Sequence, residues 1–218
     1  MKTGVHTGSQ PGNQQLKDPK QRLRHPPPRP RTTITPKSAG SSRCPYDDQR
    51  FSTLTQINAE TVSDLKPQWV ADVDSPDGLS ATPIVSQGII YLSGSFAKVF
   101  AYDGETGKMI WNFDPQVTLD KGFSNSWSAR INRGVALWNG VVYVGTGDCR
   151  LIALNAKTGK RIWETVTCDP AKGYGITGAP RVANGKVFIG NLGSDTATRG
   201  YVSAYDARSG RLAWRFYT

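Results

Sequence analysis

Val99-Phe-Ala-Tyr-Asp-Gly-Glu-Thr-Gly-Lys-Met-Ile-Trp111, Leu151-Ile-Ala-Leu-Asn-Ala-Lys-Thr-Gly-Lys-Arg-Ile-Trp163 and Val202-Ser-Ala-Tyr-Asp-Ala-Arg-Ser-Gly-Arg-Leu-Ala-Trp214 are near copies of one another. Their closing tryptophans recur at intervals of 52 and 51 residues. Each copy holds two short alternating runs around an Asp/Asn-x-x-Thr/Ser-Gly turn, in which the Asx side chain closes the turn and glycine supplies a positive φ. The three copies therefore predict three β-hairpins.

A second hairpin precedes each copy, with a glycine at its turn. The three are Pro83-Ile-Val-Ser-Gln-Gly-Ile-Ile-Tyr91, Val135-Ala-Leu-Trp-Asn-Gly-Val-Val-Tyr143 and Pro180-Arg-Val-Ala-Asn-Gly-Lys-Val-Phe188. Two hairpins give four antiparallel strands in about 50 residues, which is typical of a propeller blade. We therefore predict an all-β chain of three four-stranded blades over residues 46–218, with each closing tryptophan packed between neighbouring blades.

Three blades do not close a ring, because β-propellers contain 4 to 8 of them. The strand-like segment Pro67-Gln-Trp-Val-Ala-Asp-Val73 adds only part of another blade. The repeat count therefore predicts an incomplete propeller, and we expect that Thr218 is not the natural end of a functional protein.

Residues 1–45 differ in composition from the rest of the chain. They hold 9 Lys and Arg against one acid, 8 of the 14 prolines, and no Phe, Tyr or Trp. Such a segment cannot bury a core, so we predict a disordered, basic, Pro-rich leader. The remaining residues are nearly neutral, which gives no indication of a nucleic-acid partner.

Both histidines, His6 and His25, lie in this leader. The folded part therefore cannot hold a Ser-His-Asp nucleophile, a His-ligated zinc or a Cys-x-x-Cys-His haem site. The N-terminus lacks the apolar stretch of a secretory signal.

A further series of motifs follows in order along the chain: Gln49-Arg-Phe-Ser-Thr-Leu-Thr-Gln-Ile-Asn58, Ala81-Thr-Pro83, Asn132-Arg-Gly134, Leu151-Ile-Ala-Leu154, Ile176-Thr-Gly-Ala-Pro-Arg181, Gly190-Asn-Leu-Gly193 and Arg199-Gly-Tyr-Val-Ser-Ala-Tyr-Asp206. This series resembles the N-terminal part of the quinoprotein alcohol dehydrogenases, which use pyrroloquinoline quinone (PQQ). The resemblance implies an eight-bladed periplasmic propeller with PQQ and Ca²⁺ in its channel. It also implies oxidation of a small alcohol by hydride transfer to PQQ, with a cytochrome c as a possible electron acceptor.

The resemblance also carries over individual residues. Arg133 matches the arginine that pairs with a PQQ carboxylate, and Thr177 matches a threonine that hydrogen-bonds the cofactor. Gly193 and Ser194 match small residues that let a loop approach PQQ, and Asp195 stands where the family usually has the Glu that ligates Ca²⁺. Surface or turn positions for Arg133 and Thr177, and a solvated acid at Asp195, remain the alternatives.

Two departures separate the chain from the family pattern. Trp127 and Ser128 replace the vicinal cysteine pair that covers one face of PQQ, and Trp127 could stack on the quinone instead. Ser80 occupies the position of a cofactor-binding Glu. The catalytic Asp of the family lies in a later blade, beyond Thr218, so no residue of this chain is assigned as catalytic.

The three cysteines are Cys44, Cys149 and Cys168. Cys149 and Cys168 flank the hairpin around Lys157-Thr-Gly-Lys160. Pairing its strands so that Leu154 lies near Ile162 makes the two cysteines cross-strand neighbours, within reach of a disulfide. Two packed thiols are the alternative outside an oxidising compartment.

A second class of function also remains open. PQQ-type repeats also form non-catalytic propellers that act as protein-binding scaffolds.

We predict that limited trypsin treatment removes the leader first, because residues 1–45 carry basic cleavage sites but no side chains that form a core. Mass spectrometry of a digestion time course measures this. Protection of Arg22 and Arg31 equal to that of the repeats would contradict the prediction.

Overall fold

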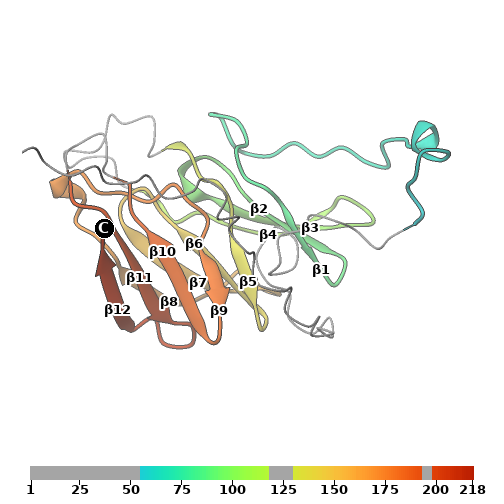
Figure 1. Ribbon diagram of the computed structural model, residues 1–218. Helices are drawn as coiled ribbons and strands as arrows, with labels where there is room; N and C mark the ends of the chain where they lie inside the picture. Colours follow the sequence, from blue (N-terminus) through green and yellow to red (C-terminus); the bar gives the residue numbers. More distant parts are fainter. Residues whose placement is uncertain (1–54, 118–129, 193–197) are drawn as a thin grey trace, which may run out of the picture. The chain divides into compact units, whose positions relative to one another are not determined.

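The computed structural model describes residues 55–117, 130–192 and 198–218, and the predicted leader lies outside these ranges. The described residues form three four-stranded antiparallel sheets, as the sequence predicted (Figure 1). Within them no helix has both the length and the apolar character that crossing a membrane requires.

Each sheet is built from two successive hairpins in chain order. The first contains β1 (Ile84–Ser86), β2 (Ile89–Ser93), β3 (Val99–Asp103) and β4 (Met109–Phe113). The second contains β5 (Ala136–Trp138), β6 (Val141–Gly145), β7 (Arg150–Asn155) and β8 (Arg161–Val166). The third contains β9 (Arg181–Ala183), β10 (Lys186–Gly190), β11 (Tyr201–Asp206) and β12 (Leu212–Tyr217). In the described residues the 3₁₀ turn η1 (Val62–Asp64) precedes β1, and the turns η2 (Ser95–Ala97) and η3 (Pro170–Lys172) lie in connections between strands.

The turn between the third and fourth strands has the same geometry in every sheet. In the first, Asp103 Oδ1 accepts hydrogen bonds from the Thr106 N–H and Oγ1, both at 2.7 Å. The glycine that follows, Gly107, has a φ of 71°. Asn155 and Asp206 close the other two turns in the same way, which confirms the predicted Asx turns.

Two of the closing tryptophans, Trp111 and Trp163, each join one sheet to the next. Trp111 Nε1 donates to the Ala156 carbonyl at 2.9 Å, and a Cβ added at Gly159 would lie 2.7 Å from the Trp111 ring. Trp163 makes the same pair of contacts with Ala207 and Gly210. The indoles of Trp111 and Trp163 therefore pack flat on the turn glycine of the following sheet, which confirms the predicted position between blades for these two. Trp214, which closes the third described sheet, is 45% exposed.

The apolar core lies between consecutive sheets. Tyr91 and Trp111 of the first sheet pack with Val142, Val144 and Leu154 of the second. Between the second and third sheets, the fully buried Tyr143 donates its hydroxyl to the Ala207 carbonyl at 3.0 Å. Burial raises the pKa of Tyr143 to about 12, so the phenol stays protonated and remains a donor.

The segment Pro67–Val73 is not a strand, which corrects the sequence expectation. In the part of the chain that the structure describes, no strand pairs with it. Trp69 nevertheless donates to the Gly104 carbonyl at 3.0 Å and covers Gly107. Trp69 therefore makes the same contact with a turn glycine as Trp111 and Trp163 do, although it does not lie in a strand.

We predict that Gly159→Ala destabilises the chain by about 1–3 kcal/mol more than Gly140→Ala does. Both glycines have a positive φ, so alanine costs each about 1–2 kcal/mol of backbone strain. Only the Cβ at Gly159 meets a buried ring, whereas nothing lies within 4 Å of the Cβ position at Gly140. Urea unfolding measures both variants, and equal losses would contradict the role of the Trp111 contact.

Candidate functional site

Arg133 and Thr177 lie in the segments that enter β5 and β9, and the structure brings them together. The Arg133 N–H donates to the Thr177 carbonyl at 2.9 Å. The exposed guanidinium donates from Nη1 to Thr177 Oγ1 at 2.5 Å. Two residues that the sequence singled out separately therefore form one pair across adjacent sheets.

The side chain of Asn132, the residue before Arg133, makes three hydrogen bonds, and no role was predicted for it from the sequence. The residue is only 2% exposed, and its amide donates from Nδ2 to the Gly145 carbonyl at 2.8 Å. Its Oδ1 accepts from Ser93 Oγ at 2.6 Å and from the Gly134 N–H at 3.0 Å. Its position in the Asn-Arg-Gly motif was the only sequence signal for a role of Asn132, because the Ser93 and Gly145 partners are distant in sequence.

The remaining site predictions fall outside the described residues. These are Gly193, Ser194 and Asp195, together with the departures Trp127 and Ser128. No group of three or more His, Cys, Asp or Glu side chains gathers where the structure is described.

Two residues that the structure does describe, Leu192 and Ser80, lie at the same end of the sheets as Arg133 and Thr177. Leu192, directly before Gly193, donates its N–H to the Gly175 carbonyl at 2.9 Å, two residues from Thr177. Ser80 is exposed. Two residues further along the chain, the Thr82 carbonyl oxygen lies 3.5 Å from where a Cβ at Gly134 would be.

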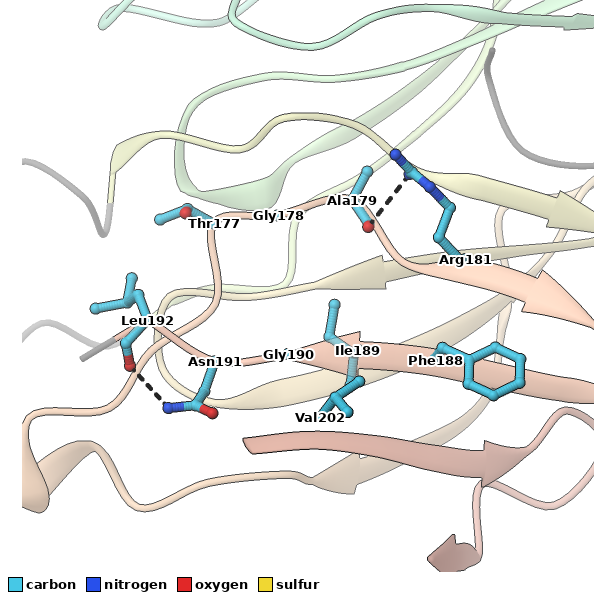
Figure 2. Close-up of a pocket in the computed structure, with 10 residues that line it drawn as sticks. All are labelled: Thr177, Gly178, Ala179, Arg181, Phe188, Ile189, Gly190, Asn191, Leu192 and Val202. Carbon is cyan, nitrogen blue, oxygen red and sulfur yellow. Dashed lines mark hydrogen bonds between the residues drawn. The ribbon is translucent and has the colours of Figure 1, made fainter. Parts of the chain in front are cut away.

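An open hollow of about 440 Å³ lies on the third sheet (Figure 2). Residues of β9, β10 and β11 line it, and Thr177 stands at its margin. Phe188, one of the lining residues, has its ring 5.9 Å from that of Trp214. The equivalent pairs, Tyr91 with Trp111 and Tyr143 with Trp163, lie at 6.1 and 5.8 Å, on faces that the next sheet covers. We therefore interpret the hollow as a sheet-packing surface and assign no substrate to it.

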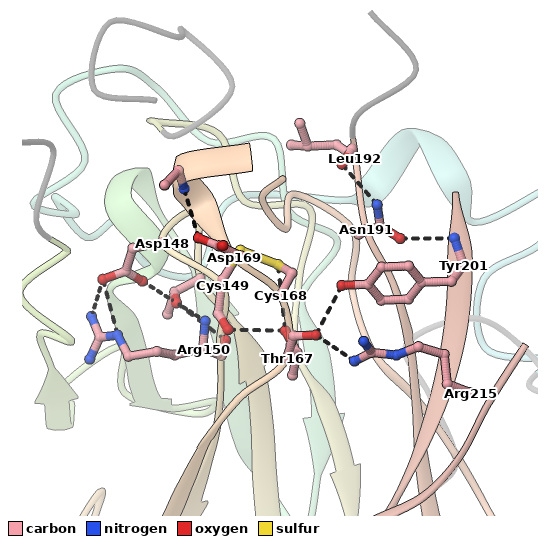
Figure 3. Close-up of a disulfide and its surroundings, with 12 residues drawn as sticks. Asp148, Cys149, Arg150, Thr167, Cys168, Asp169, Asn191, Leu192, Tyr201 and Arg215 are labelled. Atoms are coloured by element: carbon pink, nitrogen blue, oxygen red, sulfur yellow. Dashed lines mark hydrogen bonds and ion pairs between the residues drawn. A yellow bond between two sulfur atoms is a disulfide. The ribbon is translucent and has the colours of Figure 1, made fainter. Parts of the chain in front are cut away.

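Cys149 and Cys168 form a disulfide, with Cα atoms 5.0 Å apart (Figure 3). The β7–β8 register continues to Thr167, whose N–H donates to the Cys149 carbonyl at 2.8 Å. The cysteines are thus one residue out of direct opposition, and the predicted bond is present.

The carbonyl next to this bond anchors the third sheet. The Thr167 carbonyl accepts from the Tyr201 hydroxyl at 3.0 Å and from Arg215 Nη2 at 2.6 Å. The Arg215 guanidinium lies 4.0 Å from the centre of the Tyr201 ring. These contacts hold β11 and β12 against the loop that carries Cys168.

A family model described as "Glucose/ethanol/alcohol dehydrogenase, beta-propeller domain", and labelled PQQ, matches residues 44–218. The chain belongs to the PQQ-dependent alcohol dehydrogenase family. The quinohemoprotein alcohol dehydrogenase ADH IIB of Pseudomonas putida is 56% identical over 173 residues, covering 79% of this chain and 25% of that relative. The chain spans about a quarter of the length of the curated relatives that it matches.

Solved structures of this family resemble the chain in fold as well. The quinohemoprotein alcohol dehydrogenase of Comamonas testosteroni has a TM-score of 0.73 at 48% identity, covering 79% of this chain and 26% of that one. A europium-containing methanol dehydrogenase has a TM-score of 0.71 at 32% identity, covering 83% of this chain and 32% of that one.

The described residues of the PQQ-dependent dehydrogenase repeat fit the cofactor's chemistry. PQQ is a flat tricarboxylate, and an exposed guanidinium is the side chain that pairs best with a carboxylate. Because Thr177 Oγ1 accepts from Arg133, its own proton is free to point toward a second acceptor. The pair therefore offers donors of two kinds in one place.

We predict that Cys149 and Cys168 are bonded when this chain is made in an oxidising compartment. Removing both sulfurs in Cys149→Ala/Cys168→Ala lowers the free energy of unfolding by about 3 kcal/mol, because the bond closes a short loop in the unfolded chain. Non-reducing peptide mapping and urea unfolding measure the two effects. Cys44→Ser is the matched control and changes neither, whereas two freely alkylated thiols in the folded, secreted chain would contradict the bond.

Proposed function

We propose that this chain supplies propeller repeats of a dehydrogenase that oxidises a small alcohol by hydride transfer to PQQ, assisted by Ca²⁺. The observation that carries the proposal is the Arg133–Thr177 pair, held across adjacent sheets with the guanidinium exposed. When bound, PQQ supplies the two-electron acceptor for the hydride of the alcohol. The residues of this chain bind and orient; none of them is assigned as the catalytic base.

Arg133 supplies a fixed positive charge for one cofactor carboxylate, and Thr177 supplies a hydroxyl donor beside it. Gly193 and Ser194 add a loop of small residues. Asp195 contributes a carboxylate oxygen, the ligand type that Ca²⁺ and other hard cations prefer. These last three roles rest on the resemblance of the sequence to the family.

The alternative is a non-catalytic scaffold built from the same repeats. Relatives at 56% and 48% identity that carry the name quinohemoprotein alcohol dehydrogenase favour the enzyme. The name of a further relative, lupanine 17-hydroxylase, includes cytochrome c, which supports a cytochrome c as the electron acceptor. The Cys149–Cys168 bond is consistent with the periplasm, an oxidising compartment.

We predict that the natural polypeptide carrying these residues, loaded with PQQ and Ca²⁺, reduces a dye acceptor when ethanol is added. Arg133→Ala weakens PQQ binding about 10- to 150-fold, since a charge-assisted bond contributes about 1.5–3 kcal/mol. Arg208→Ala, an exposed arginine in the turn between β11 and β12, is the control and leaves binding unchanged. Absence of both PQQ binding and dye reduction would favour the scaffold.

The 218-residue chain by itself gives no sustained turnover in the same assay, because in the resembled family the cofactor takes contacts from blades all around the ring. Losing two charge-assisted contacts lowers affinity by about two to four powers of ten. Alcohol-dependent dye reduction by the monomeric chain alone would contradict this expectation.

A further inference from the structure

Asn132 connects three parts of the fold around the entry to β5. Through Ser93 it reaches the end of β2 in the first sheet, and through Gly145 it reaches the end of β6 in the second. Its third bond, to the Gly134 N–H, fixes the backbone on the far side of Arg133. Arg133 is therefore exposed itself but lies between the buried Asn132 and Gly134, whose N–H the Asn132 side chain holds.

Gly145 supports the partner residue in a different way. A Cβ added at Gly145 would lie 2.5 Å from Ile176 Cγ2, so Ile176 packs directly on the glycine. Ile176 is 1% exposed and immediately precedes Thr177. The same residue that accepts the Asn132 amide therefore also seats the residue before Thr177.

A purely structural role does not require an amide at this place. Apolar groups of the same shape can fill a buried space at little cost, whereas a buried amide needs every partner in position. Asn132 has all of its partners in position. Its bonds to Ser93 and Gly145 reach two different sheets. Buried polar networks of this kind fix one geometry rather than add much stability.

We propose that Asn132 and Gly145 form a positioning bracket that sets the relative placement of the Arg133 guanidinium and the Thr177 hydroxyl toward a planar polycarboxylate. The polycarboxylate is the PQQ of the proposed function, on which this inference rests. Asn132 acts on Arg133 through Gly134 and the neighbouring backbone, and Gly145 acts on Thr177 through Ile176. Both are positioning residues, since neither reaches the exposed guanidinium in the structure.

The test uses the full chain and a mild variant, Ser93→Ala, which removes one bond to Asn132 and leaves the other two. Ser203→Ala is the matched control, because Ser203 is equally buried and hydrogen-bonds one side chain, Arg215. Amide hydrogen exchange by NMR is read at Arg133, whose N–H bonds Thr177, with the Thr167 amide as internal reference. We expect exchange at Arg133 to rise tenfold or more in Ser93→Ala alone, with no selective change in Ser203→Ala.

Gly145→Ala tests the second half of the bracket, because alanine keeps the carbonyl that accepts the Asn132 amide and adds a Cβ against Ile176. It displaces Ile176 and accelerates exchange at Arg133, and Gly145→Ala/Ile176→Ala, which removes the clashing Cγ2, restores slower exchange. If Ser93→Ala and Gly145→Ala change exchange at Arg133 no more than they change it at Thr167, the bracket is only structural and the proposal is overturned.

A PQQ titration of the same samples separates this inference from the proposed function. In the unaltered chain, PQQ at high concentration shifts the Arg133 side-chain Nε signal, and Ser93→Ala raises the concentration needed about tenfold. If PQQ does not shift that signal in the unaltered chain, PQQ binding by Arg133 fails, while the exchange measurement still decides the bracket.

Discussion

The packing of one indole on one glycine, repeated along the chain, sets the arrangement of the sheets. Trp69, Trp111 and Trp163 each cover the glycine of the next Asx turn and donate to a carbonyl at the start of that turn. A flat ring leaves no room for a Cβ, and the N–H fixes its rotation. Adjacent sheets therefore meet at a set distance and register, which in turn brings the segments entering β5 and β9 close enough for Arg133 to reach Thr177.

Most of the fold could be predicted from the sequence because its signals are local. An Asx side chain, a glycine and alternating apolar residues determine a hairpin within about 13 residues, and three copies remove the ambiguity of one. The Cys149–Cys168 bond followed from hairpin register for the same reason. Pro67–Val73 looked like a strand because its alternation is real, but a strand also needs a partner, and periodicity cannot supply one.

The candidate site could be predicted only in part. Arg133 and Thr177 were found by resemblance, yet their direct contact joins residues 44 apart and depends on how two sheets pack. Asn132 is the first residue of the Asn-Arg-Gly motif, but its partner Ser93 lies 39 residues away on another sheet. A buried amide and a surface amide look alike in a sequence, so its role emerges only when burial and partners are known.

The three repeats differ just before their first strands, β1, β5 and β9. This difference distinguishes residues that support the fold from residues proposed to bind a cofactor. Strand register makes Ile84, Ala136 and Arg181 equivalent, since they pair with Tyr91, Tyr143 and Phe188. Four residues earlier stand Ser80, Asn132 and Thr177, and the next residues are Ala81, Arg133 and Gly178. Turns and tryptophans recur because every pair of sheets needs the same contact. Under the proposed function, a cofactor on the propeller axis would meet each sheet with a different part of its outline, so the positions proposed to face it have no reason to repeat.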